Sequence, residues 1–157
     1  MALRNTVTEG DDTLRKVCRP VGEINDRIQT IIDDMIDTMN EAEGVGIAAP
    51  QVGILRRIFV VDIGEGPIVL INPEILETSG EQEGPEGCLS VPGKGGHVVR
   101  PNYVKIKGLD REGNEVVYEG TELLARAFLH ENDHLDGVLY IDKADEIWEV
   151  SDEDYED

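Results

Sequence analysis

Two segments of the chain repeat apolar residues with the period of a helix. Between Asn25 and about Ala42, isoleucine and methionine recur every three or four residues. This spacing predicts an amphipathic helix with one buried face, capped by Asn25 or Asp26. A second helix is predicted between Thr121 and Gly137, because Thr121 can cap its start and glycine commonly ends a helix.

Between these helices, short apolar or alternating runs predict strands. Five runs have this character: 56–63, 67–72, 74–79, 102–109 and 115–119. The last two alternate apolar and polar side chains about a turn at 111–114, as in a β-hairpin. Hairpin-type connections imply an α+β fold, with mostly antiparallel sheet segments packed around a central C-terminal helix and with an N-terminal helix. Residues 138–141 are apolar and are expected to form a short strand or turn.

The second predicted helix carries His130, Glu131 and His134 in the pattern HExxH. Two histidines four residues apart are offset by about 40° around a helix, so both rings can reach one metal ion. Glu131 lies about 60° from His134 on the same side, where its carboxylate can reach a metal-bound water without being a ligand. These side chains share an apolar face with Phe128 and Leu135, which favours chemistry over the alternative of two core histidines and a chance glutamate.

A third protein ligand decides what kind of metal site this is. HExxH peptidases often use a downstream glutamate or histidine, but no histidine follows His134, and the later acidic residues lie mostly in a segment poor in apolar residues. The stronger candidate is Cys88, in the segment EGCLSVP at 86–92. One thiolate and two imidazoles leave a coordination position open, as a catalytic metal requires.

Three further segments are interpreted from composition. Residues 43–53 are rich in glycine and alanine, which favours a substrate-binding edge over a plain turn, whereas a phosphate loop is disfavoured because no lysine is present. Residues 81–87 are expected to form an acidic loop, and His97 is expected to be a loop residue rather than a ligand. Cys18 is expected to be a packed residue, not a site.

Size and charge limit the classes of protein to consider. The 157 residues predict one domain over 1–141, followed by an acidic tail over 142–157 that is expected to be solvated and frayed. The 14 basic and 34 acidic residues give a net charge of -20, which argues against binding nucleic acid or an anionic membrane directly. Because neither a membrane span nor a signal peptide is visible, a cytoplasmic protein is expected.

Three motifs in order, GVGIAAPQVG, EGCLSVP and HENDHLDG, resemble the signature motifs of the peptide deformylase family. The resemblance extends from about Leu14 to Tyr140. It implies removal of the N-formyl group from the initiator methionine of new polypeptides, with release of formate. It also implies one divalent metal per chain, with iron(II) as the physiological ion and zinc, nickel or cobalt able to occupy the site.

The resemblance also implies chemical roles for individual residues. Glu131 would be the general acid and base, and Gln51 would stabilise the oxyanion together with the backbone N–H of Leu89. The metal ligands would be Cys88, His130 and His134.

Substrate contacts follow from the same resemblance. Val45, Gly46 and Gly87 would offer the backbone that binds an extended peptide, as in β-strand addition. Leu123 and Ala127 would line the methionine pocket. The expected partners are therefore formyl-methionyl peptides and nascent chains.

Some positions depart from the family or bear on rival functions. Leu129 stands where glutamine or cysteine is frequent, and Asn132 stands in a position that is often apolar. Arg100 is expected to pair with Glu86 or Asp133 near the ligands, unless its ion pair is an ordinary surface one.

Some family members dock on ribosomes with a basic C-terminal helix, whereas this chain ends in SDEDYED, so at most a transient ribosome contact is expected. The rival functions are an HExxH metallopeptidase and a non-catalytic deformylase-like binding protein.

Overall fold

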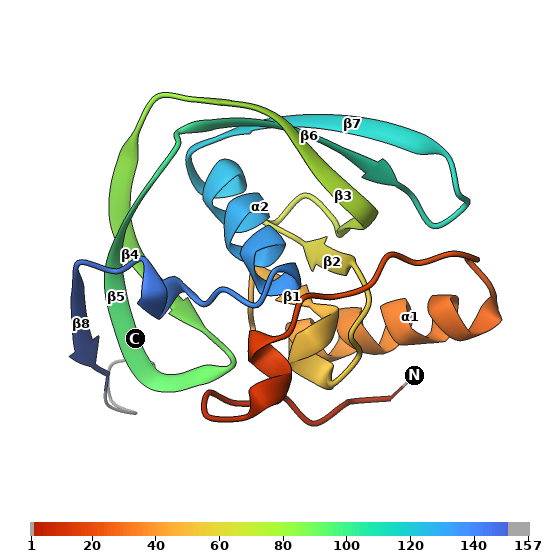
Figure 1. The fold of residues 1–157 in the computed structure, drawn as a ribbon, viewed down its shortest axis with the longest axis horizontal. Coiled ribbons are helices and arrows are strands. Elements are labelled where there is room, and N and C mark those ends of the chain that lie inside the picture. The colour runs from red at the N-terminus through yellow and green to blue at the C-terminus, as the bar shows by residue number, and fades with distance from the viewer. Residues whose placement is uncertain (1, 151–157) are drawn as a thin grey trace.

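The computed structural model describes residues 2–150 (Figure 1). The helices of this region are α1 (Asp26–Glu41), α2 (Glu122–Leu135) and the short 3-10 helices η1 (Asp12–Arg15), η2 (Ala49–Val52) and η3 (Tyr140–Asp142). The strands are β1 (Gly46–Ala48), β2 (Ile58–Val61), β3 (Ile68–Ser79), β4 (Gln82–Cys88), β5 (Val91–Arg100), β6 (Tyr103–Leu109), β7 (Glu115–Thr121) and β8 (Glu146–Glu149). Within residues 2–150, no helix combines the length and apolar character needed to cross a membrane.

The strands form two antiparallel sheets. One sheet has the order β1-β2-β3-β6-β7 and the other has the order β4-β5-β8. Short connections after Ser79 and after Arg100 carry the chain from β3 into β4 and from β5 into β6, so the two sheets meet along a bend (Figure 1). The α+β fold predicted from hairpin-type connections is confirmed.

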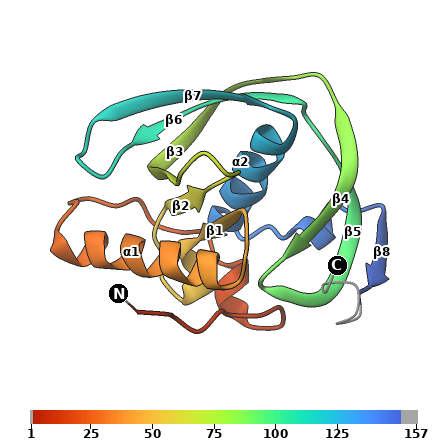
Figure 2. The ribbon, with the colours of Figure 1, turned by 180° about the vertical axis from the view of Figure 1, so that it is seen from behind.

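Helix α2 lies between the two sheets (Figures 1 and 2). Its Ala125 and Phe128 are fully buried in a core that includes Phe59 of β2 and Leu70 of β3. The rings of Phe59 and Phe128 lie 6.1 Å apart, centre to centre. The helix ends before Gly137, which has a φ of +77° and leaves no room for a Cβ, because that atom would lie 2.5 Å from the carbonyl oxygen of Arg15. The predicted helix and its glycine stop are therefore confirmed.

Helix α1 covers the other side of the first sheet. The Asn25 side chain caps it by accepting a hydrogen bond from the N–H of Ile28 at 3.1 Å. Its apolar stripe is buried in a second core against β1, η2 and β2, through Ile28, Ile31, Ile32, Met35 and Met39. The periodicity of this segment thus predicted both the helix and its buried face.

Three expectations for the second sheet are wrong. The acidic loop expected at 81–87 is strand β4, and His97 lies in strand β5 rather than in a loop. Residues 146–149 of the predicted frayed tail form β8, which pairs with β5. The glycines of this sheet misled the prediction. In β5 they make room for neighbouring side chains instead of marking turns: a Cβ on Gly95 would lie 2.7 Å from Nε1 of Trp148. Residues 151–157 of the predicted tail lie outside the described residues.

Smaller differences concern the ends of elements. The predicted strands 67–72 and 74–79 form one strand, β3, which is irregular between Ile71 and Glu74. The apolar run 138–141 leads into η3 and forms no strand.

Candidate metal centre and active site

Three side chains that can bind a metal converge between β4 and α2. The sulfur of Cys88 lies 3.3 Å from Nε2 of His134. One donor atom from each of Cys88, His130 and His134 lies within 4.8 Å of the other two. Cys88 reaches this position at the end of β4, after a register shift between Glu86 and Cys88. The helix places the two histidine rings 5.2 Å apart.

The chemistry of these three donors fits a transition metal. A thiolate and two imidazoles suit iron and zinc, whereas magnesium and calcium prefer oxygen ligands. Burial lowers the pKa of His134, as does the neighbouring His130, and this favours the neutral imidazole that binds metals. Burial alone would also lower the pKa of His130, but Glu131, Cys88 and Glu86 raise it well above its ordinary value. The site therefore attracts positive charge at the point where a metal would supply it.

Glu131 lies beside the ligands in a confined place. It is 4% exposed, and burial raises the pKa of its carboxyl group to about 7. Its carboxylate lies against Gly46 of β1: a Cβ on that glycine would come within 2.5 Å of Oε2. A carboxyl group that titrates near neutral pH can both accept and donate a proton there.

The amide of Gln51 points toward Cys88. Its Oε1 accepts a hydrogen bond from the N–H of Ala48 at 2.9 Å, which fixes the orientation of the amide. Its Nε2 then donates to the Ser90 hydroxyl at 3.1 Å and to the Cys88 sulfur at 3.4 Å. Gln51 is therefore a buried donor directed at the ligand cluster.

A cavity of about 580 Å³ opens beside the ligands. It brings together most residues predicted for the site, including Gln51, Cys88, Leu89, His130 and Glu131. The predicted peptide and methionine contacts also line it: Val45, Gly46, Gly87, Leu123 and Ala127. His134 does not line the cavity, but its Nε2 contacts the sulfur of Cys88, which does.

Comparison with known proteins identifies the family to which the chain belongs. A model of the polypeptide deformylase family matches residues 3–149. The chain belongs to the polypeptide deformylase family. It is 63% identical over 145 residues to the peptide deformylase of Agathobacter rectalis, covering 92% of each chain. It is 60% identical over 143 residues to that of Clostridium botulinum, covering 91% of this chain and 97% of the other.

Solved structures of family members share this fold. The Thermotoga maritima peptide deformylase superposes with a TM-score of 0.90 at 42% identity, covering 92% of this chain and 99% of the other. The Synechococcus elongatus peptide deformylase in complex with actinonin superposes with a TM-score of 0.88 at 40% identity, covering 90% of this chain and 79% of the other. At these identities the likeness extends beyond the fold to the family.

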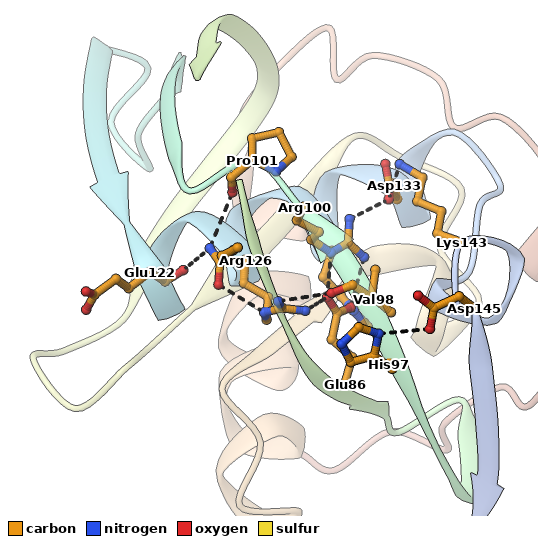
Figure 3. Close-up of polar contacts among 12 residues, drawn as sticks. Glu86, His97, Val98, Arg100, Pro101, Glu122, Arg126, Asp133, Lys143 and Asp145 are labelled. Carbon is orange, nitrogen blue, oxygen red and sulfur yellow. Dashed lines mark hydrogen bonds and ion pairs between the residues drawn. The ribbon is translucent and has the colours of Figure 1, made fainter. Parts of the chain in front are cut away.

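In this family member, a buried carboxylate organises the surroundings of the ligands (Figure 3). Glu86 accepts hydrogen bonds from Nδ1 of His130 at 2.8 Å and from Nη2 of Arg100 at 2.9 Å. Arg126 also donates to it, and Arg100 reaches on to Asp133 at 3.0 Å. Burial alone would raise the pKa of Glu86, but the hydrogen bonds from His130 and Arg100 lower it to about 2. Because Glu86 occupies Nδ1, the Nε2 atom of His130 remains available for a metal.

The sequence anticipated part of this network. Arg100 was expected to pair with Glu86 or Asp133, and it contacts both. Two residues were missed: Glu86 as a partner of His130, and Arg126, which also lines the cavity. The signal for Arg126 was its position four residues before His130, on the same helix face.

The remaining singled-out residues are packed. Cys18 is 3% exposed, and burial raises the pKa of its thiol to about 11, so it behaves as the core residue that was expected. Leu129 and Asn132, the two positions expected to depart from the family pattern, are 7% and 8% exposed. Leu129 belongs to the main core, where its side chain contributes to packing.

Proposed function

We propose that this chain is a metal-dependent amide hydrolase that removes the formyl group from the N-terminal formyl-methionine of newly made polypeptides and releases formate. One observation carries the proposal. The donors of Cys88, His130 and His134 converge beside the carboxyl group of Glu131. This group of residues adjoins a cavity large enough for a methionine side chain and part of a peptide.

The proposed ligands are Cys88, His130 and His134, which would hold one divalent metal per chain. We propose iron(II) as the native ion, with zinc, nickel or cobalt as substitutes, because a mixed sulfur and nitrogen set accepts all four. When bound, such a metal would polarise the formyl carbonyl and lower the pKa of a water molecule.

The chain's own residues would move the protons and stabilise the developing charge. Glu131 would accept a proton from the attacking water and then donate it to the leaving amine, a role that suits a pKa of about 7. The Gln51 amide and the Leu89 N–H would donate hydrogen bonds to the oxyanion. In acyl-transfer sites, one such donor contributes roughly 3 to 4 kcal/mol.

Peptide binding would use the exposed edges of both sheets. β1 ends the first sheet and β4 ends the second, and both border the cavity. An extended peptide could therefore pair with backbone groups of Val45, Gly46 and Gly87. Ala127 would form the floor of the methionine pocket and Leu123, which is 49% exposed, its open side.

The proposed setting is the cytoplasm, where nascent chains are made. Ribosome contact would be at most transient, because the net charge is -20. Direct nucleic-acid binding is not expected, for the same electrostatic reason.

The test is formate release from formyl-Met-Ala-Ser by protein prepared anaerobically with iron(II). Acetyl-Met-Ala-Ser and unblocked Met-Ala-Ser serve as matched substrates. We expect formate from the formylated peptide and no cleavage of the other two. Cleavage of internal bonds in the unblocked peptide would indicate the HExxH metallopeptidase instead. Absence of any turnover by metal-loaded protein would indicate the non-catalytic binding protein.

A further inference from the structure

The segment that follows α2 reaches back to the metal site. Tyr140, the first residue of η3, is 1% exposed, and its ring stacks on that of His130. The ring centres lie 5.9 Å apart, with an angle of 23° between the planes. Glu86 holds the same histidine by its edge, through Nδ1 at 2.8 Å. His130 is therefore constrained by a hydrogen bond in the plane of its ring and by an aromatic face above that plane.

Tyr140 is in turn held in place by β5. A Cβ on Gly96 would lie 3.0 Å from Cε2 of Tyr140 and 3.1 Å from Cβ of Ala144, so the absence of a side chain there makes room for η3. The preceding Gly95 makes room for a different residue, because its Cβ would meet the indole of Trp148. Two consecutive glycines thus admit two different parts of the C-terminal segment.

Pairing with β5 holds the C-terminal segment on these glycines. β8 runs antiparallel to β5, with Gly95 opposite Trp148 and Gly96 opposite Ile147. The N–H of Asp145 donates to the carbonyl of His97 at 3.0 Å. Figures 1 and 2 show β8 alongside β5 in both views. Tyr140 therefore cannot move away from His130 without disturbing contacts along this edge.

Charged contacts add to this attachment. Lys143, just after η3, pairs with Asp133 of α2 at 3.0 Å, and Asp133 also accepts from Arg100 (Figure 3). Asp142 pairs with Arg15 of η1. The segment is thereby tied both to the helix that carries the histidines and to the N-terminal part of the chain.

We propose that Tyr140 is a positioning residue for His130, and that the segment 140–149 holds Tyr140 in that position. The inference rests on the proposed metal site. A histidine already held in its binding orientation loses less freedom when it binds a metal, so the stacked ring should increase metal affinity. The acidic C-terminal segment would then be part of the metal site's support rather than a frayed tail.

The first test compares Tyr140→Leu with Tyr140→Phe, which keeps the stacked ring. Affinity for cobalt(II) is measured by competition with a chelator, and stability of the metal-free protein by urea unfolding. We expect about tenfold weaker binding in Tyr140→Leu, the low end for loss of a group that supports a ligand, and affinity within about twofold of wild type in Tyr140→Phe. Leu14→Ala is the matched control, because Leu14 is buried in the same small core. It should lose stability and keep its affinity.

Equal affinities in Tyr140→Leu and Tyr140→Phe would overturn the inference while leaving the proposed function intact. An affinity loss in Leu14→Ala as large as that in Tyr140→Leu would also overturn it, because general packing would then explain the effect. A wild-type chain that binds no cobalt(II) would overturn the proposed function and this inference together.

The second test uses the two glycines of β5. Gly96→Ala places a methyl group against Tyr140 and Ala144, whereas Gly95→Ala places one against the indole of Trp148. Gly96→Ala displaces Tyr140 directly, whereas Gly95→Ala acts on it only through β8, so we expect the first substitution to weaken cobalt(II) binding more than the second. Equal effects of the two substitutions on affinity would contradict a specific role for Tyr140.

Discussion

At the scale of single residues, the contact between Gly46 and Glu131 links the peptide-binding edge to the proton-transfer group. The glycine is needed for space: its φ is not in the left-handed region, but a Cβ would lie 2.5 Å from the Glu131 carboxylate. The resemblance of the motifs implies that the backbone of Gly46 binds the substrate peptide. The structure adds a steric role, which follows from the burial of Glu131 directly beside it.

Gly46→Ala should therefore displace the Glu131 carboxylate. We expect turnover to fall about 100-fold, the scale associated with a misplacement of about 1 Å at a reacting group, while one metal per chain is retained. Gly44→Ala is the matched control, because its Cβ would meet its nearest neighbours at 3.7 Å, an ordinary contact distance. Formate release and metal content measured on the same samples check this. Full activity in Gly46→Ala would show that Glu131 does not need the space that Gly46 leaves.

The residues of the site differ in how far sequence predicts them. His130, Glu131 and His134 share one helix, so the helical period alone predicts that they lie together. Cys88 and Gln51 lie on other elements, so the need for a third metal ligand indicated Cys88, and the resemblance of the motifs indicated Gln51. The contact between Glu86 and His130 was missed, because a glutamate in an acidic stretch looks solvated until the fold surrounds it.

At the scale of elements, Glu86 joins β4, β5 and α2. It accepts hydrogen bonds from Arg100 of β5 and from Arg126 and His130 of α2, and all four side chains are buried. Removing the charge of Glu86 would leave two arginines in the interior without this counter-charge. The second sheet is thus attached to the central helix by an ion-pair network as well as by apolar packing.

Glu86→Gln should consequently destabilise the whole fold. The expected loss is about 3 to 5 kcal/mol, the usual effect of removing one partner from a buried ion pair. Urea unfolding of the metal-free protein measures it, with Glu83→Gln as the control on an exposed position of the same strand. The control should change stability by less than about 0.5 kcal/mol. A loss that small in Glu86→Gln would mean that the network does not attach the sheet.

The elements themselves were predictable where their pattern is local. Both long helices and the hairpin of β6 and β7 follow from apolar periodicity and turn residues. Strands β4, β5 and β8 were not predicted, because their glycines and charges are explained only by packing between distant segments. Gly96 beside Tyr140 is the clearest example, since the reason for the glycine lies 44 residues away in the sequence.

At the scale of the whole molecule, the net charge of -20 limits the partners. Phosphate-rich surfaces repel such a protein unless a basic patch compensates. We therefore expect no stable complex with ribosomes. Co-sedimentation at low ionic strength checks this, with a variant truncated after Val150 as the comparison. Sedimentation of the full chain with ribosomes, lost on truncation, would show that the C-terminal residues dock after all.

We propose that this chain hydrolyses formyl-methionyl peptides with a metal held by Cys88, His130 and His134 and a proton moved by Glu131. Bound iron and formate release, measured on the same anaerobic preparations of wild type and Glu131→Gln, test this proposal. We expect one metal per chain in both proteins and formate from the wild type alone. Substantial turnover by Glu131→Gln, or no formate from metal-loaded wild type, would contradict it.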